Sequence, residues 1–126
     1  MWVNRLVGRI GIHWYNLPGN HDLNFMSPDD RHSLETFKRT FGPTYYSFDV
    51  GRVHFVMLDS VVYLGRNAGR AKPDAWGAGF YVGRIAQRRL DWLSNDMRHV
   101  PEDKLVVIGM HIQLDTPGGW PARQRR

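Results

Sequence analysis

The sequence predicts an α/β fold, and three features of its pattern support this prediction. A near-continuous apolar run at 104–110 has the length and composition of a strand that is buried on both faces. Residues 44–59 alternate in strand fashion around a central Gly-Arg turn, which is typical of a β-hairpin. Between these strands, the apolar spacing of 85–97 predicts a helix that packs on the sheet, with Arg88 and Arg89 on its solvent side.

The remaining elements follow in chain order. The first seven residues suit the last turns of a helix, and Gly8 suits its end. The aromatic-rich run 10–17 predicts a strand. Capping residues and early acids predict a helix over 29–40. Residues 60–83 are Gly-rich and predict a long loop that forms part of a site, and 115–126 predict an irregular tail.

Composition excludes several classes of protein. With 126 residues and 42% hydrophobic residues, the chain has the content of one packed domain or of part of a larger one. No apolar run approaches the ~20 residues of a membrane span, and no leader pattern follows Met1, so we expect neither a span nor a signal peptide in this chain. The net charge of +5 is scattered rather than gathered in a stripe, so we expect no dedicated nucleic-acid-binding role.

A group of polar residues follows the expected strand 10–17. Pro18-Gly19 ends the strand, and Asn20-His21-Asp22 then offers an amide oxygen, an imidazole and a carboxylate in succession. This composition suits a catalytic loop on an α/β scaffold. Pro-Gly-Asn is also a common turn sequence, so a purely structural turn is an equal alternative for this stretch taken alone.

A second histidine, His111, stands at the carboxyl end of the strand 104–110, where α/β sheets place their chemistry. Asn oxygen and His nitrogen without any cysteine sulfur favour Mn, Fe or Zn over copper(I) or an iron–sulfur cluster. Isolated strand histidines are more often structural than ligands, and we expect this of His13 and His54. Two histidines at strand ends, one beside Asn20, favour a metal centre.

Four motifs in this order resemble the calcineurin-like metallophosphoesterases, specifically the bacterial branch with long multidomain chains. They are Pro18-Gly19-Asn20-His21-Asp22, the hairpin 41–59, the segment 87–96 with Leu90, Trp92 and Leu93, and the strand 106–112 that contains His111. The resemblance covers about residues 12–114, which is most of the chain.

The resemblance implies a four-layer αββα sandwich with two metal ions bound at strand ends. It implies that Asn20 and His111 are ligands of one ion, that His21 is the catalytic histidine and that Asp22 positions it. The implied reaction is hydrolysis of phosphomonoesters or phosphodiesters by a metal-activated water, with divalent Mn, Fe or Zn as cofactor.

The sequence also departs from the family pattern. The opening Asp-x-His element, the Gly-Asp element that bridges the metals and the closing Gly-His-x-His pair are missing. We therefore expect 1–126 to be a single partial domain that lacks the N-terminal and C-terminal metal motifs and has little activity alone.

Two further expectations follow from a partial domain. The alternative to an enzyme is a non-catalytic partner-binding module on a degenerate phosphoesterase fold. Exposed sheet edges would favour self-association, with the strand 105–110 as the likeliest aggregation site. The compartment is not assigned, although relatives of this branch are often exported.

Overall fold

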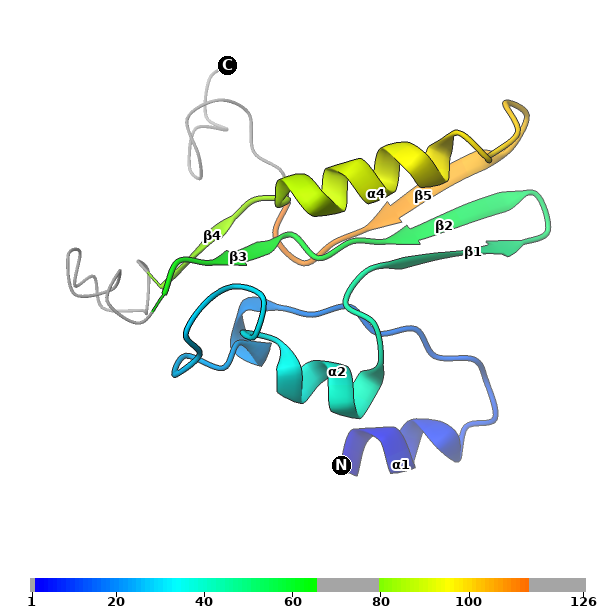
Figure 1. The fold of residues 1–126 in the computed structure, drawn as a ribbon. Helices are drawn as coiled ribbons and strands as arrows, with labels where there is room; N and C mark the ends of the chain where they lie inside the picture. Colours follow the sequence, from blue (N-terminus) through cyan, green and yellow to red (C-terminus); the bar gives the residue numbers. More distant parts are fainter. Residues whose placement is uncertain (1, 66–79, 114–126) are drawn as a thin grey trace, which may run out of the picture.

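A computed structural model describes residues 2–65 and 80–113 (Figure 1). The helical elements are α1 (Trp2–Gly8), the 3-10 turn η1 (Asn20–Asp22), α2 (Glu35–Phe41) and α4 (Gln87–Met97). The strands are β1 (Tyr46–Val50), β2 (Val53–Met57), β3 (Val61–Tyr63), β4 (Tyr81–Gly83) and β5 (Leu105–Gly109). The described part is thus mixed α/β, as predicted, and it forms small sheets rather than a complete four-layer sandwich.

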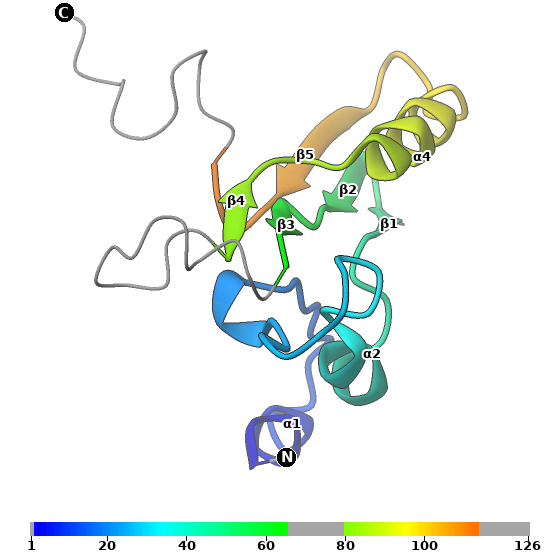
Figure 2. The same ribbon diagram turned by 60° about the vertical axis from the view of Figure 1, so that its left-hand side comes forward.

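The strands form two small sheets. A three-stranded sheet has the order β1-β2-β5, in which β1 and β2 are antiparallel and β5 runs parallel to β2. This confirms the predicted hairpin. A two-stranded antiparallel sheet pairs β3 with β4. Figures 1 and 2 show α4 on one side of the strands, with α1 and α2 on the other.

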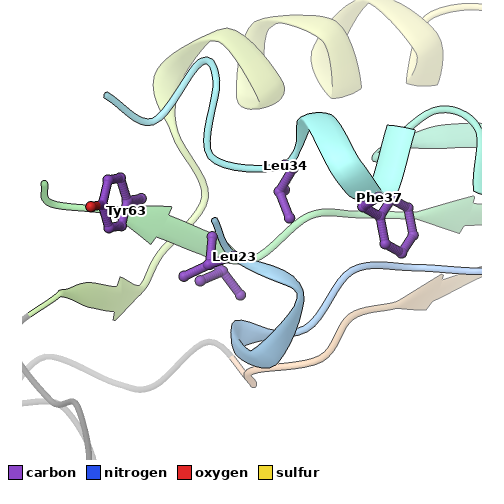
Figure 3. Close-up of a cluster of buried hydrophobic side chains, with 5 residues drawn as sticks. Leu23, Leu34, Phe37 and Tyr63 are labelled. Atoms are coloured by element: carbon purple, nitrogen blue, oxygen red, sulfur yellow. The ribbon is translucent and has the colours of Figure 1, made fainter. Parts of the chain in front are cut away.

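Two apolar cores hold these layers together. Under α4, the buried Val56, Leu58 and Ile85 pack with the half-buried Trp92 and Leu93. A second core joins α2 to β3 and to the loop after η1 (Figure 3). Its buried members are Leu23, Leu34, Phe37, Val61 and Tyr63. The second core fixes the chain immediately after η1, which is the part of the sequence expected to carry the site.

The expected strand at 10–17 is wrong. Residues 11–19 have no regular secondary structure, and Ile12 is 61% exposed. The segment is held to the sheet by side chains instead: Tyr15 stacks on Phe48 with ring centroids 3.8 Å apart, and the Tyr46 hydroxyl donates to the Asn16 carbonyl at 2.7 Å. An apolar pattern gives a strand only where a partner edge is free to pair with it, and no described strand pairs with this segment.

The strand at the end of the described chain differs from expectation in its burial. It forms, as β5, but Leu105 is 64% exposed and Val107 and Ile108 are exposed too. Among the described strands β5 pairs with β2 alone, so it lies at an edge of the sheet rather than inside it. The expectation of burial on both faces is therefore wrong.

The helices and the long loop also differ in part. The helix expected over 29–40 begins only at Glu35, because residues 29–34 form turns in which the Asp29 and Asp30 oxygens accept bonds from His32 and Ser33. The expected loop 60–83 contains β3 and β4 at its two ends. Its centre, 66–79, and the expected tail at 115–126 lie outside the described residues.

The face that α4 turns to the sheet is rotated from the predicted one. Leu90 is exposed, whereas Arg89 is buried and Trp92 and Asp96 are partly buried. The solvent position predicted for Arg88 is confirmed, and that predicted for Arg89 is wrong. Polar partners beneath the helix stabilise the rotation, because Arg89 contacts Asp59 and Asp96 contacts His54.

Candidate functional site

The polar motif forms a tight turn between the two cores. The Asp22 amide donates to the Gly19 carbonyl at 3.1 Å, and the Gly19 amide donates to Asp22 Oδ2 at 2.8 Å. These two bonds close η1 on itself. The carboxylate of Asp22 thus stabilises the turn, and its positioning of His21 stays a prediction.

Asn20 and His111 lie side by side. Asn20 Oδ1 is 2.8 Å from His111 Nε2, although the residues are 91 positions apart in the sequence. His111 stands two residues beyond β5, and the parallel pairing of β5 with β2 carries it to the loop at 18–22. The approach is close, because a Cβ at Gly19 would lie 3.1 Å from the His111 ring. Glycine at this position leaves the space that the imidazole occupies.

A third residue, Tyr81, completes this arrangement. Asn20 Nδ2 donates to the Tyr81 hydroxyl at 2.6 Å. Tyr81 belongs to β4 and pairs across the small sheet with Tyr63. The sequence showed Tyr81 only as one aromatic among several in a Gly-rich stretch, and nothing local in the pattern connects it to the motif at 18–22.

His21 is exposed and lines a shallow cavity of about 200 Å³ between η1 and α2. The other lining residues are Asp22, Leu23, Asn24, Thr36, Phe37, Thr40 and Phe41. Leu23, Phe37 and Phe41 give the cavity an apolar base, and its other members are polar. The expected catalytic histidine therefore faces solvent beside a small mixed cavity.

The donor pair at Asn20 and His111 fits part of a metal shell. Adjacent ligands of a Mn, Fe or Zn ion with donor distances of about 2.1 Å lie about 3 Å apart, and the Asn20–His111 separation of 2.8 Å matches this. Both atoms are donors that these metals accept. Within 2–65 and 80–113, no cluster of three or more His, Cys, Asp or Glu side chains could hold an ion. The described residues thus bring together two side chains of suitable ligand type and not a full set of ligands.

The two other histidines expected to be structural differ in their surroundings. His13 is exposed with its ring centroid 6.5 Å from that of Tyr15, and its structural role stays a prediction. His54 is buried, with Nδ1 2.8 Å from Asp49 Oδ1 and Nε2 2.9 Å from Asp96 Oδ2. The bond to Asp96, supported by the one to Asp49, raises the pKa of His54 against the opposing effect of burial. His54 ties β1 and β2 to α4, and the structural role predicted for it is confirmed.

A buried ion pair lies beneath α4, and the sequence pattern did not indicate it. Arg89 is 1% exposed and its guanidinium contacts Asp59, which is fully buried, at 2.5 Å. Arg89 also donates to the Val61 carbonyl, and the Val61 amide donates to Asp59 Oδ1. Burial raises the pKa of Asp59 to about 6, although Arg89 acts against this shift. The pair joins α4 to the chain that links β2 with β3.

Comparisons with known proteins give a partial similarity. No family model matches the chain, and no solved structure matches it. A stretch of 46 residues is 44% identical to Cell division control protein 1 of Saccharomyces cerevisiae. The stretch is 36% of this chain and 9% of the yeast protein, so the chain covers far less than two thirds of that relative. None of the helices in the described ranges is long and apolar enough to cross a membrane.

Proposed function

We propose that this chain is part of a metal-dependent phosphoesterase domain that hydrolyses phosphomonoesters or phosphodiesters. The observation that carries the proposal is the 2.8 Å approach of Asn20 Oδ1 to His111 Nε2, which brings together two side chains of the types that bind Mn, Fe or Zn. The resemblance of the four sequence motifs to the calcineurin-like metallophosphoesterases supports it.

The proposed roles follow from the positions of the side chains. Asn20 and His111 would hold one divalent ion, Mn, Fe or Zn. When bound, such ions polarise the phosphoryl oxygens and lower the pKa of a coordinated water, which becomes the nucleophile. His21 is the next residue to Asn20 and is exposed, so its imidazole is free to meet the substrate. As the water oxygen bonds to phosphorus and the bond to the leaving group breaks, His21 would donate a proton to the leaving oxygen.

The proposal extends to Asp22 and to the domain as a whole. The carboxylate of Asp22 would hold the turn, and through it the backbone of His21, in the orientation that the proton transfer needs. The described residues contain no group of three or more His, Cys, Asp or Glu side chains that could complete this site or hold a second ion. We therefore expect slow turnover from the 126-residue chain.

Hydrolysis of p-nitrophenyl phosphate and bis(p-nitrophenyl) phosphate, with Mn²⁺ or Zn²⁺ added, tests the proposal. We expect slow release of nitrophenol that requires the metal, stops with chelator and is lost in His21→Ala. The matched control is His13→Ala, which removes an exposed histidine from outside the site. Equal rates in both variants would contradict the proton-donating role of His21, and a rate indifferent to chelator would contradict the role of the metal ion.

A second candidate is a non-catalytic module that binds a protein partner. It is favoured by the exposed apolar side chains of the segment before the motif, among them Ile10, Ile12 and Trp14. A partner that is captured equally well with and without chelator, by wild type and by Asn20→Ala, but poorly by Trp14→Ala, would support this candidate over the enzyme.

A further inference from the structure

The side-chain amide of Asn20 is held from two directions. Its oxygen lies 2.8 Å from His111 Nε2, and its nitrogen donates to the Tyr81 hydroxyl at 2.6 Å. The three side chains come from η1, from β4 and from the residues after β5, so the sequence separates them widely. Figures 1 and 2 show β4 beside the chain that follows β5, where Ile112 contacts Gly83.

The orientation of this amide decides whether Asn20 can bind a cation. An amide has an acceptor end and a donor end, and a half-turn exchanges them. With the oxygen toward His111, as in this structure, Oδ1 accepts a hydrogen bond from the Nε2–H of the ring, and both atoms can turn a lone pair to an ion once that proton is lost. With the nitrogen there, the donor N–H bonds would face the place of the ion and repel it.

We propose that Tyr81 is a positioning residue that fixes the Asn20 amide with Oδ1 toward His111. The hydroxyl accepts the Nδ2–H bond and so leaves the oxygen for the site. Residues that hydrogen-bond to metal ligands commonly orient those ligands in this way. That the oxygen serves a metal ion rests on the proposed function, whereas the orientation of the amide does not.

Tyr81 is well placed to act as a fixed partner. Its backbone is paired with Tyr63 in the β3–β4 sheet, and its side chain packs against the core that contains Leu23 and Val61. The ring therefore does not depend on Asn20 for its position. Because the packed ring already fixes the hydroxyl, little conformational entropy is lost when it accepts the hydrogen bond from Asn20 Nδ2, and the bond is correspondingly stronger.

The test has two independent readouts on Tyr81→Phe, which deletes the hydroxyl and keeps the packed ring. The first uses the metal-free protein: nuclear magnetic resonance of the Asn20 side-chain amide, including its contact with the ring of residue 81. The second is calorimetric titration with Mn²⁺. The matched control is Tyr46→Phe, which deletes a hydroxyl that donates at 2.7 Å to the Asn16 carbonyl, outside the site.

We expect the Asn20 Hδ2 protons to contact the Tyr81 ring in wild type and to lose their hydrogen-bond shift in Tyr81→Phe but not in Tyr46→Phe. We expect Mn²⁺ affinity to fall about 10-fold or more in Tyr81→Phe. In an Asn20→Ala background, the same change should have no further effect on Mn²⁺ affinity, whereas a general loss of structure would weaken binding in both backgrounds.

Two results would overturn the inference. One is a wild-type spectrum in which the Asn20 amide protons have no contact with Tyr81, which decides the matter even if Tyr81→Phe does not fold. The other is a Tyr81→Phe chain with unchanged Asn20 signals. Absence of Mn²⁺ binding in wild type with the expected Asn20 signals would refute the proposed function and leave the positioning role supported.

Discussion

Replacing Arg89 by Met should destabilise the chain strongly, and by an amount that depends on pH. Arg89 and Asp59 are both within one per cent of full burial, and their contact is 2.5 Å. Removing one partner of a buried ion pair leaves an uncompensated charge and costs about 3–5 kcal/mol. Met fills a similar length, so lost packing adds little to this figure. A cost of this size is a large share of the free energy of unfolding of a typical domain, which is ~5–15 kcal/mol.

The pH dependence follows from the carboxyl group of Asp59. Its pKa in the folded chain is raised to about 6 by burial, and Arg89 opposes that shift, so the variant should raise it further. A folded-state pKa above the unfolded value means that the folded state binds the proton more tightly. The stabilising contribution is then fully present below the unfolded pKa of 3.8 and is lost as pH rises through the folded pKa.

The free energy of unfolding from urea titrations at pH 5 and pH 8, followed by circular dichroism, measures both effects. We expect Arg89→Met to lower the free energy of unfolding by about 3–5 kcal/mol at pH 8, and by less at pH 5, where Asp59 binds a proton and no bare charge is left. Each unit by which the variant raises the pKa of Asp59 corresponds to about 1.4 kcal/mol. Arg89→Met/Asp59→Asn should recover much of the loss at pH 8. A loss below about 1 kcal/mol, or full additivity of Asp59→Asn and Arg89→Met, would refute a coupled buried pair.

Two further predictions concern His54 and Gly19. His54 lies between Asp49 and Asp96, and because its pKa is raised, its stabilisation is present below pH 6.5 and is lost as pH rises through the raised folded value. His54→Gln should flatten the decline of the unfolding free energy between pH 6 and 9, and an unchanged decline would show that another group causes it. Gly19→Ala should displace the His111 ring, since the new Cβ would lie 3.1 Å from it, and should weaken Mn²⁺ binding with little change in melting temperature. Unaltered His111 resonances in that variant would argue against the close approach.

The parts of the fold that the sequence predicted are those in which local pattern and packing agree. The hairpin at 44–59 has alternating side chains, a two-residue turn and a partner directly next in the chain. The strand 104–110 forms as β5, but its burial could not be predicted because burial depends on which elements flank it. The run 10–17 shows the same limit, since its pattern cannot show whether a free strand edge is available.

The polar contacts were less predictable, because each depends on an alignment between distant elements. Asn20 and His111 could be proposed together, since both follow strand-like runs and strand ends gather at one edge of a sheet. Tyr81 could not, because its contact with Asn20 requires β4 to form within a stretch that resembles a loop. Arg89 is buried because it pairs with Asp59, which lies thirty positions earlier in the sequence. The helical pattern alone predicted that the Arg89 side chain faces solvent.

The most direct test of the central claim is calorimetric titration of the chain with Mn²⁺ and with Zn²⁺. Wild type is compared with Asn20→Ala/His111→Ala, which removes both proposed ligands. The control His13→Ala/Asn16→Ala removes the same two side-chain types from the segment before the motif. We predict weak but saturable binding in wild type and in the control, and none in Asn20→Ala/His111→Ala. Equal binding in all three chains, or no binding in a wild-type chain shown to be folded, would contradict a metal site at Asn20 and His111.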